Sequence, residues 1–453
     1  MLHFVTLVAQ LCYDSLFYFR ISISYGRLVM RYLFLLLLIS LSCWGLTLPL
    51  DAMQQGFLFW RNQGVQLTGI LALALMGALM LMATRPAWLE QRLGGLDHLY
   101  QLHKWSGITA GSMVLLHWLL TKSPRWLVDW GLLELGPRPA GAHVPDAWRG
   151  IAKEVGEYCF YAMILFMIVS LVKVLPYGRF RQIHKVGAVL FLLAAFHSIY
   201  LLPDATRWTP FGLLTLIAGV LGSLAALWSL FGLIGRPRRY PGQIIEIREH
   251  DGNVLELEVV LPTDFQDEYL PGQFALLTLH KEEGSHPFTI VREDVQNGSI
   301  IFAIKALGDY TRQLIGQVQE GDDVTVEGPY GRFVLPESGG QEYWIAGGIG
   351  ITPFLAWLEG LVAEGYHRPG AHLYYCVNNR QEILFAERLQ QLSKQTGVKV
   401  TIVDREIDGF LDPSRLDIDE DTRLWFCGPK GMRDMLLKHV PASQLHYEQF
   451  DFR

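Results

Sequence analysis

The chain has 453 residues, more than one ordinary domain holds, and its composition changes along its length. Apolar runs dominate residues 30–234, whereas the remainder has the charges, glycines and short alternating segments of a soluble α/β protein. The formal net charge of −6 argues against nucleic acid as a partner. The five cysteines show no Cys-x-x-Cys spacing, so neither a disulfide framework nor an iron–sulfur cluster is expected.

The first half of the chain is predicted to cross a membrane several times. Residues 1–29 are expected to be a disordered or amphipathic lead-in, or an upstream extension of a chain that begins at Met30. Arg and Lys gather in the short loops on the side of the two termini, so both termini are predicted to be cytoplasmic. Six segments are apolar enough to span a bilayer: 30–50, 64–83, 103–120, 155–175, 185–202 and 210–234.

Four histidines fall in two pairs at these apolar segments, His103 with His117 and His184 with His197. Each pair spans about 20 Å of helix, most of the thickness of the hydrocarbon layer. Ionisable groups at that depth are costly, and ligation of iron would offset the cost. His103 and His184 are predicted at the inner level and the other two at the outer level. Each level then offers two axial ligands, so two haem b groups are predicted.

The spacing within the two pairs differs, and this constrains the helices. On an ideal helix, fourteen residues bring His117 to within about 40° of the face of His103. Thirteen residues place His197 about 140° away from His184. The fifth segment must therefore bend, change pitch or offset its haems. The competing interpretation is that all four are buried histidines bonded to the backbone, and their matched depth on two parallel spans favours haem ligation over it.

The second half of the chain is predicted to form two soluble domains, a barrel over 240–336 and an α/β domain over 341–453, after a membrane domain over 30–234. Short alternating segments between Gln243 and Val326 predict a small antiparallel barrel. From Tyr343 the pattern becomes buried strand, turn and helix, which predicts a parallel sheet. The glycine-rich turn from Gly347 to Pro353 is typical of a dinucleotide site, although a tight turn without a ligand has the same pattern.

Several motifs now occur in a fixed order: His286-Pro-Phe-Thr-Ile290, Lys305 with Gly308-Asp-Tyr-Thr311, the Gly347 turn, and Cys427-Gly-Pro429. Together with the histidine intervals, they resemble the NADPH oxidase and ferric reductase superfamily, and the short chain looks most like the prokaryotic members. The resemblance implies a six-helix transmembrane haem-binding bundle followed by a ferredoxin-NADP reductase-like module. That module comprises an antiparallel β-barrel FAD domain and an α/β nucleotide domain. It also implies a multi-pass protein of the cell inner membrane with a cytoplasmic dehydrogenase module.

The resemblance assigns roles residue by residue. The flavin is lined by His286, Pro287, Phe288 and Thr289, and its phosphates are held by Lys305, Gly308 and Thr311. The dinucleotide is cradled by Gly347, Gly348, Gly350 and Thr352, and the hydride-transfer site is bordered by Cys427, Gly428 and Pro429. An aromatic residue near the C-terminus is expected to stack on the flavin, and Phe450 is preferred to Phe452. Without the resemblance, the C-terminal segment would instead be interpreted as a closing edge strand of the sheet.

The nucleotide preference depends on Arg380, which follows the second strand of the α/β domain. A guanidinium there favours the 2′-phosphate of NADPH, because the two pair bidentately. The competing interpretation is an ordinary solvated surface charge, with NADH as the reductant. No acidic residue stands out as a partner for the ribose 2′-hydroxyl of NADH.

The expected reaction is hydride transfer from NADPH to FAD, followed by single electrons through the inner and outer haems to an acceptor outside. Oxygen, giving superoxide, is the favoured acceptor, and a chelate of Fe(III) or Cu(II) is the alternative. Oxidase relatives often carry a further histidine where this chain has Thr121, and Arg61 is the candidate to compensate. A third possibility is a non-catalytic haem-carrying electron-transfer subunit. The flavin and nucleotide motifs argue against it, so no obligate protein partner is expected.

Overall fold

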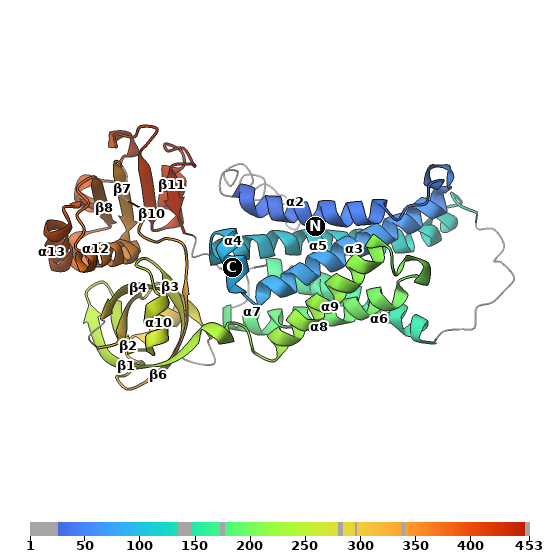
Figure 1. Ribbon diagram of the computed structural model, residues 1–453, viewed down its shortest axis with the longest axis horizontal. Coiled ribbons are helices and arrows are strands. Elements are labelled where there is room, and N and C mark those ends of the chain that lie inside the picture. The colour runs from blue at the N-terminus through green and yellow to red at the C-terminus, as the bar shows by residue number, and fades with distance from the viewer. Residues whose placement is uncertain are drawn as a thin grey trace. The chain divides into compact units, whose positions relative to one another are not determined.

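The computed structural model describes residues 26–134, 147–172, 177–279, 284–294, 297–337 and 340–448. The chain divides into two compact units. One unit is helical and consists of residues 28–93 and 98–235. The other contains residues 236–453 together with the short segment 94–97. Figure 1 shows the helices of the first unit and the barrel and sheet of the second.

The helical unit has helices at all six positions where apolar spans were expected. They are α2 (Gly26–Gly45), α3 (Phe57–Ala83), α4 (Ala87–Leu93), α5 (Leu96–Asp129), α6 (Ala147–Leu171), α7 (Tyr177–His184), α8 (Val186–Leu201) and α9 (Pro210–Leu230). Among the described helices, four segments are long and apolar enough to cross a membrane: Phe57–Ala83, Ala147–Leu171, Gly178–Leu201 and Pro210–Leu230.

Two of the six expected spans therefore fall short of that standard. The apolar part of the first, Met30–Gly45, is shorter than a span requires. The third, α5, is 34 residues long but is less apolar than α3, α6 and α9. Membrane crossing by α2 and α5 stays a prediction.

Glycines set the close packing of three helices in this unit. α3 packs against α8 and α9, and α8 also packs against α6 and α9. A Cβ added to Gly222 of α9 would lie 2.9 Å from the Cα of Gly77 in α3 and 2.3 Å from the ring of Phe191 in α8. Small residues let helix backbones approach closely where lipid surrounds them. The fully buried Phe191 ring fills the space that these glycines leave.

The helical segment that carries His184 and His197 is irregular at Lys185, directly after His184 and at the start of the fifth expected span. α7 ends at His184 and α8 begins at Val186, with Lys185 in a turn between them. A straight helix would have placed His184 and His197 on different faces. The N–H of Lys185 bonds to the carbonyl of Gln182 and that of Ala188 to the carbonyl of Lys185, three residues back in each case, so the pitch tightens at this turn. A change of pitch is one of the distortions expected from the thirteen-residue interval.

The first part of the second unit is a closed six-stranded antiparallel barrel, as predicted. Its strands run in the order β1-β2-β5-β4-β3-β6. They are β1 (Arg239–His250), β2 (Val254–Val260), β3 (Phe274–Thr278), β4 (His286–Asp294), β5 (Ser299–Lys305) and β6 (Asp323–Tyr330), with short helices α10 (Thr263–Glu268) and α11 (Asp309–Leu314). Alternate residues of β2, such as Leu255 and Leu257, fill the barrel, because successive side chains of a strand point to opposite faces.

The second part is a five-stranded parallel sheet in the order β11-β10-β7-β8-β9. Its strands are β7 (Glu342–Gly347), β8 (Ala371–Val377), β9 (Lys399–Asp404), β10 (Arg423–Cys427) and β11 (Leu445–Tyr447). Its helices are α12 (Thr352–Glu364), α13 (Ala386–Thr396), α14 (Arg405–Asp408) and α15 (Lys430–Leu436). The chain leaves β7 in one direction toward β8 and later returns to its other side at β10. This makes the carboxyl ends of β7 and β10 a topological switch point, where α/β sheets bind ligands.

The barrel and the sheet share one hydrophobic core. Val291 of β4 and Ile301 of β5 point outward from the barrel and pack with Phe354 and Leu355 of α12. The same core contains the fully buried indole of Trp344 on β7. The two parts therefore form one continuous packed body, and α12 is the element that joins them.

A buried ion pair, Arg368–Glu342, anchors the start of β7. Arg368 donates to both carboxylate oxygens of Glu342 at 3.1 and 2.7 Å, and both side chains are almost fully buried. Replacing Arg368 with Met leaves the buried carboxylate of Glu342 without its cation. We expect this variant to lose about 3–5 kcal/mol of unfolding free energy. Tryptophan fluorescence during thermal unfolding of the detergent-solubilised protein would measure the loss.

Arg388→Met is the matched control. Arg388 makes the same bidentate contact with Glu359, but the pair is more exposed, so the expected loss is at most about 1 kcal/mol. Equal losses in the two variants would contradict a special role for the buried pair.

Candidate functional site

The His286–Thr289 segment forms the start of β4, where it pairs with β3. Its side chains are partly exposed, and Phe288 packs against the barrel core. The ring of His286 stacks on that of Tyr310 in α11, with centroids 3.9 Å apart and planes at 16°. This stacking joins the start of β4 to the Gly308–Thr311 turn, so the structure brings together two segments predicted to bind the same flavin.

The Gly308–Thr311 turn is organised by the hydroxyl of Thr311. Its Oγ1 accepts hydrogen bonds from the backbone N–H groups of Leu307 and Gly308, both at 3.0 Å. It also lies 3.2 Å from the carbonyl oxygen of Gly308, to which it donates. The side chain predicted to bind phosphate is therefore already used to shape the backbone that would bind it.

Lys305 lies at the end of β5 and forms an ion pair with Glu382, which follows β8 in the α/β domain. Its Nζ lies 3.0 Å from Oε2 of Glu382. The hydrogen bond from Lys305 lowers the pKa of the Glu382 carboxyl, and a further bond from Asn378 acts in the same direction. Lys305 was predicted as a phosphate ligand. The structure places it between the flavin barrel and the loop that also carries Arg380.

The nucleotide turn packs directly against the loop after β10. A Cβ on Gly350 would lie 2.2 Å from the carbonyl oxygen of Cys427, and one on Gly347 would lie 2.6 Å from Cδ of Pro429. These glycines therefore allow two loops to meet at the switch point, in addition to the expected approach of a ligand. Gly348 has φ +56°, and its open side faces no atom within 4 Å. Thr352 begins α12, whose N-terminal N–H groups follow this turn.

Cys427 is buried at the end of β10. Burial, with a smaller contribution from the carboxylate of Glu448, raises the pKa of its thiol to about 12. The thiol is therefore neutral near pH 7. Glu448, which follows β11, accepts hydrogen bonds from the backbone N–H groups of Arg332 at 2.6 Å and Phe333 at 3.2 Å. It ties the end of the chain to the segment between barrel and sheet. Phe450 and Phe452 lie outside the described residues.

Arg380 is exposed beyond the end of β8, with 77% of its side chain accessible. Its Nε lies 3.9 Å from Oδ2 of Asp404, the last residue of β9. Sequence reasoning found no acidic residue at this place and missed Asp404. The available signal was its position, because Asp404 directly follows a predicted buried strand and the ends of neighbouring parallel strands lie side by side.

The four histidines of the helical unit meet in two pairs. The ring centroids of His103 and His184 are 6.0 Å apart with planes at 55°. Those of His117 and His197 are 6.3 Å apart with planes at 85°. In each pair α5 provides one ring, and α7 or α8 provides the other. These are the pairings that the two-level interpretation of the sequence requires.

Backbone carbonyls define the protonation of the second pair. Nδ1 of His117 lies 2.9 Å from the carbonyl oxygen of Val65, and Nδ1 of His197 lies 2.8 Å from that of Ala152. A carbonyl only accepts, so each Nδ1 carries the proton and each Nε2 keeps a lone pair for a metal. A Cβ on Gly156 would lie 2.2 Å from Nδ1 of His197, so a glycine is needed beside this ring.

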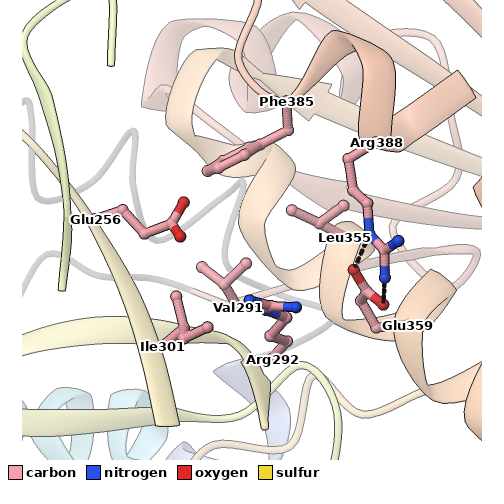
Figure 2. A pocket seen from close by; sticks show the side chains of 8 residues that line it. All are labelled: Glu256, Val291, Arg292, Ile301, Leu355, Glu359, Phe385 and Arg388. Atoms are coloured by element: carbon pink, nitrogen blue, oxygen red, sulfur yellow. Dashed lines mark hydrogen bonds and ion pairs between the residues drawn. The ribbon is translucent and has the colours of Figure 1, made fainter. Parts of the chain in front are cut away.

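A separate cavity of about 230 Å³ lies between the barrel and the helices α12 and α13. Figure 2 shows the side chains around it, including the ion pair between Arg388 and Glu359. Its walls are Glu256, Val291, Arg292, Ile301, Leu355, Glu359, Phe385 and Arg388. None of the residues predicted to bind a cofactor lines it. The β4–α11 segment and the switch point are therefore the candidate sites of the second unit, and the histidine pairs are those of the helical unit.

Three known families match successive parts of the chain. Residues 68–195 match the ferric reductase like transmembrane component, residues 240–334 match an FAD-binding domain, and residues 344–438 match the oxidoreductase NAD-binding domain. The first match includes three of the four histidines, and His197 lies two residues beyond it. The second and third include the flavin and nucleotide segments described above.

Individual proteins resemble this chain over part of their length. The reductase component of propane 2-monooxygenase from Mycolicibacterium smegmatis is 26% identical over 46% of this chain and 66% of its own. The carnitine monooxygenase reductase subunit of Escherichia coli is 33% identical over 31% of this chain and 44% of its own. The chain thus spans about two thirds or less of these relatives. Among solved structures, the flavohem-like FAD/NAD binding domain of nitric oxide dioxygenase from Vibrio cholerae is similar with a TM-score of 0.40 and 22% identity, covering 46% of this chain and 97% of that one.

The turn organised by Thr311 yields a prediction for flavin binding. Thr311→Val removes the oxygen that accepts from two backbone N–H groups, so the turn loses its shape. We expect the dissociation constant of FAD to rise on the order of fivefold. Flavin fluorescence during titration of the purified apoprotein with FAD measures this. Thr311→Ser keeps the oxygen and should bind as the unmodified protein does, and equal affinity of the Val variant would contradict the role.

Proposed function

The chain has the domain architecture of the ferric reductase and NADPH oxidase superfamily, and from that premise we propose that it carries electrons across a membrane. NADPH is the proposed donor, FAD and two b-type haems are the proposed carriers, and oxygen is the proposed acceptor. The observation that carries the proposal is the meeting of the four histidines in two pairs, on the same chain as an FAD-binding and an NAD-binding domain.

The distances within the histidine pairs fit ligation of iron. A metal–imidazole nitrogen bond is about 2 Å long, and the ring centre lies about 1 Å beyond the nitrogen. Two imidazoles on opposite sides of one metal therefore have centroids about 6 Å apart, and the observed separations are 6.0 and 6.3 Å. Among the described residues, no three His, Cys, Asp or Glu side chains gather to hold a metal ion. A two-histidine site suits an iron whose other ligands come from a macrocycle.

The residues of the second unit would bind and orient the flavin and the nucleotide. The start of β4, with the α11 turn, is the proposed flavin site, and the glycines at the switch point are the proposed nucleotide site. FAD, when bound, accepts two electrons at once and releases them singly. Cys427 presents a neutral thiol at the end of β10, so it borders the proposed hydride-transfer position without adding charge.

The proposed orientation places both termini and the dehydrogenase module in the cytoplasm, with the helical unit in the cell inner membrane. Basic residues in the short loops support it, since such residues favour the cytoplasmic side. NADPH is then available to the second unit, and His117 with His197 lie toward the outer face.

Arg380 supports NADPH over NADH as the proposed donor. Its guanidinium is largely exposed, so a 2′-phosphate can approach it, and a bidentate contact with phosphate is stronger than one with a hydroxyl. Asp404 lies beside it and would repel a phosphate placed closer to β9. The proposed phosphate position is therefore on the solvent side of Arg380, away from Asp404.

Arg61 supports oxygen as the proposed acceptor. It donates to the carbonyl oxygens of Leu120 at 2.7 Å and Thr121 at 2.6 Å, and the hydroxyl of Thr121 donates to the carbonyl of His117. The cation of Arg61 is thus held beside Thr121, which lies one helical turn after His117. Oxidase relatives often have another histidine at the position of Thr121. When oxygen gains one electron it becomes superoxide, and a cation stabilises the developing negative charge.

Haem ligation predicts a selective loss of cofactor. In His117→Leu or His197→Leu, one of the two pairs loses a ligand, so we expect haem content to fall from two to one per flavin. Reduction of the flavin by NADPH should persist, because the second unit is unchanged. Pyridine haemochrome assays and stopped-flow flavin absorbance provide the two measurements. His439→Leu, at an exposed position in the second unit, is the control and should keep both haems. Unchanged haem content in both membrane variants would refute the outer site.

The acceptor is tested by comparing two assays on the purified protein with NADPH and FAD. We expect superoxide-dismutase-sensitive reduction of cytochrome c, and about a tenfold lower rate in Arg61→Ala than in Arg61→Lys. Reduction of an Fe(III) or Cu(II) chelate without oxygen, saturating tightly, would instead establish a metalloreductase. A protein that consumes NADPH only when a partner protein is added would be an electron-transfer subunit.

A further inference from the structure

One histidine of the helical unit is held differently from the two outer-level rings. His184 contacts two phenyl rings, Phe166 of α6 and Phe180 of α7, at centroid distances of 5.1 and 5.0 Å. Both rings lie within about 30° of the plane of the imidazole, at 28° and 31°. Aromatic rings attract one another in such offset arrangements. The flat faces of two phenyl groups therefore oppose rotation of the His184 ring.

Gly187, just after the turn between α7 and α8, provides the space for the contact between Phe166 and His184. Gly187 lies in the first turn of α8, and a Cβ there would come within 2.8 Å of Cζ of Phe166. The ring of Phe166 thus occupies the place that a side chain at this position would take. Any larger residue at Gly187 would have to push Phe166 away from His184.

Hydrogen bonding constrains His184 less than it constrains the outer-level pair. His117 and His197 each have a backbone carbonyl within 2.9 Å of Nδ1, which fixes the ring about its Cβ–Cγ bond. The corresponding atom of His184 lies 3.4 Å from the hydroxyl of Ser170. Hydrogen bonds of that length are weak, and a hydroxyl can rotate. Among the described residues, packing is therefore the stronger constraint on the orientation of the His184 ring.

We infer that Phe166 and Phe180 are positioning residues that set the plane of the His184 ring. This inference rests on the proposed haem function. The angle between two axial imidazole planes determines how far the iron d orbitals that overlap with the rings are split. The ring planes of the inner-level pair lie at 55° and those of the outer-level pair at 85°, so two irons bound there would differ electronically although all four ligands would be histidines. Ligand orientation is one of the means by which a protein tunes a metal.

Electron paramagnetic resonance of the oxidised holoprotein tests this inference. We expect two distinct low-spin ferric signals. The outer-level pair, whose ring planes are nearly perpendicular, should give the signal with the larger maximum g value. Phe166→Leu and Phe180→Leu should shift and broaden only the inner-level signal. Without the phenyl contact, the His184 ring samples a range of angles. The His197→Leu background, in which the inner-level signal remains alone, assigns the signal.

Three further variants distinguish positioning from general packing. Phe180→Tyr keeps the flat ring and should keep the signal. Gly187→Ala removes no aromatic residue, but its Cβ displaces the ring of Phe166, so this variant should shift the inner-level signal. Phe160→Leu is the control, because this α6 ring stacks on Trp118 at 4.7 Å. It should leave the inner-level signal as it is.

The outcomes separate this inference from the haem proposal. Two haems with an unchanged inner-level signal in Phe166→Leu, Phe180→Leu and Gly187→Ala would overturn the positioning role. Loss of the inner haem in Phe180→Leu with its retention in Phe180→Tyr would support the role, because the ring is then required. A purified protein that binds no haem would overturn the proposed function itself.

Discussion

The interruption after His184 is the constraint on which the helical unit depends. A continuous helix would rotate His197 about 140° from His184, and then only one of them could meet a histidine of α5. The turn at Lys185 lets both face the same helix. The same turn places Gly187 where Phe166 needs room, so one local irregularity both pairs the rings and supports one of them.

In both units, glycines leave room for a neighbouring group where a side chain would otherwise lie. Gly156 makes room for the imidazole of His197, and Gly350 makes room for the carbonyl of Cys427. The glycines of a binding motif are usually explained by the close approach of the ligand that the loop binds. Here the first demand on Gly350 comes from the protein, because the loops after β7 and β10 must meet before they can form a crevice. Ligand approach is then a second demand on an already restricted position.

Local patterns predicted the larger features of the fold, and long-range contacts were beyond them. Alternating apolar residues predicted the barrel, and buried runs between helices predicted the parallel sheet, because both patterns express burial along one element. The histidine spacing predicted which rings would meet. The bond from Lys305 to Glu382 joins residues 77 apart in the chain, and that from Arg332 to Glu448 joins residues 116 apart, so no local pattern contains them. For two of the six predicted spans, α2 and α5, the described helix does not reach both the length and the hydropathy of a membrane span, so their membrane crossing stays a prediction.

The arrangement of the second unit bears on how hydride transfer is achieved. α12 begins at the nucleotide turn and packs its Phe354 and Leu355 against Val291, two residues beyond the Thr289 of the proposed flavin strand. The separation of the two proposed binding segments is therefore set by a buried helix. Lys305 and Glu382 add a second link farther along the same boundary. Reactions that need two groups at a fixed distance gain most from such pre-organisation, since the entropy of alignment is lost on folding and need not be lost again when the nucleotide binds.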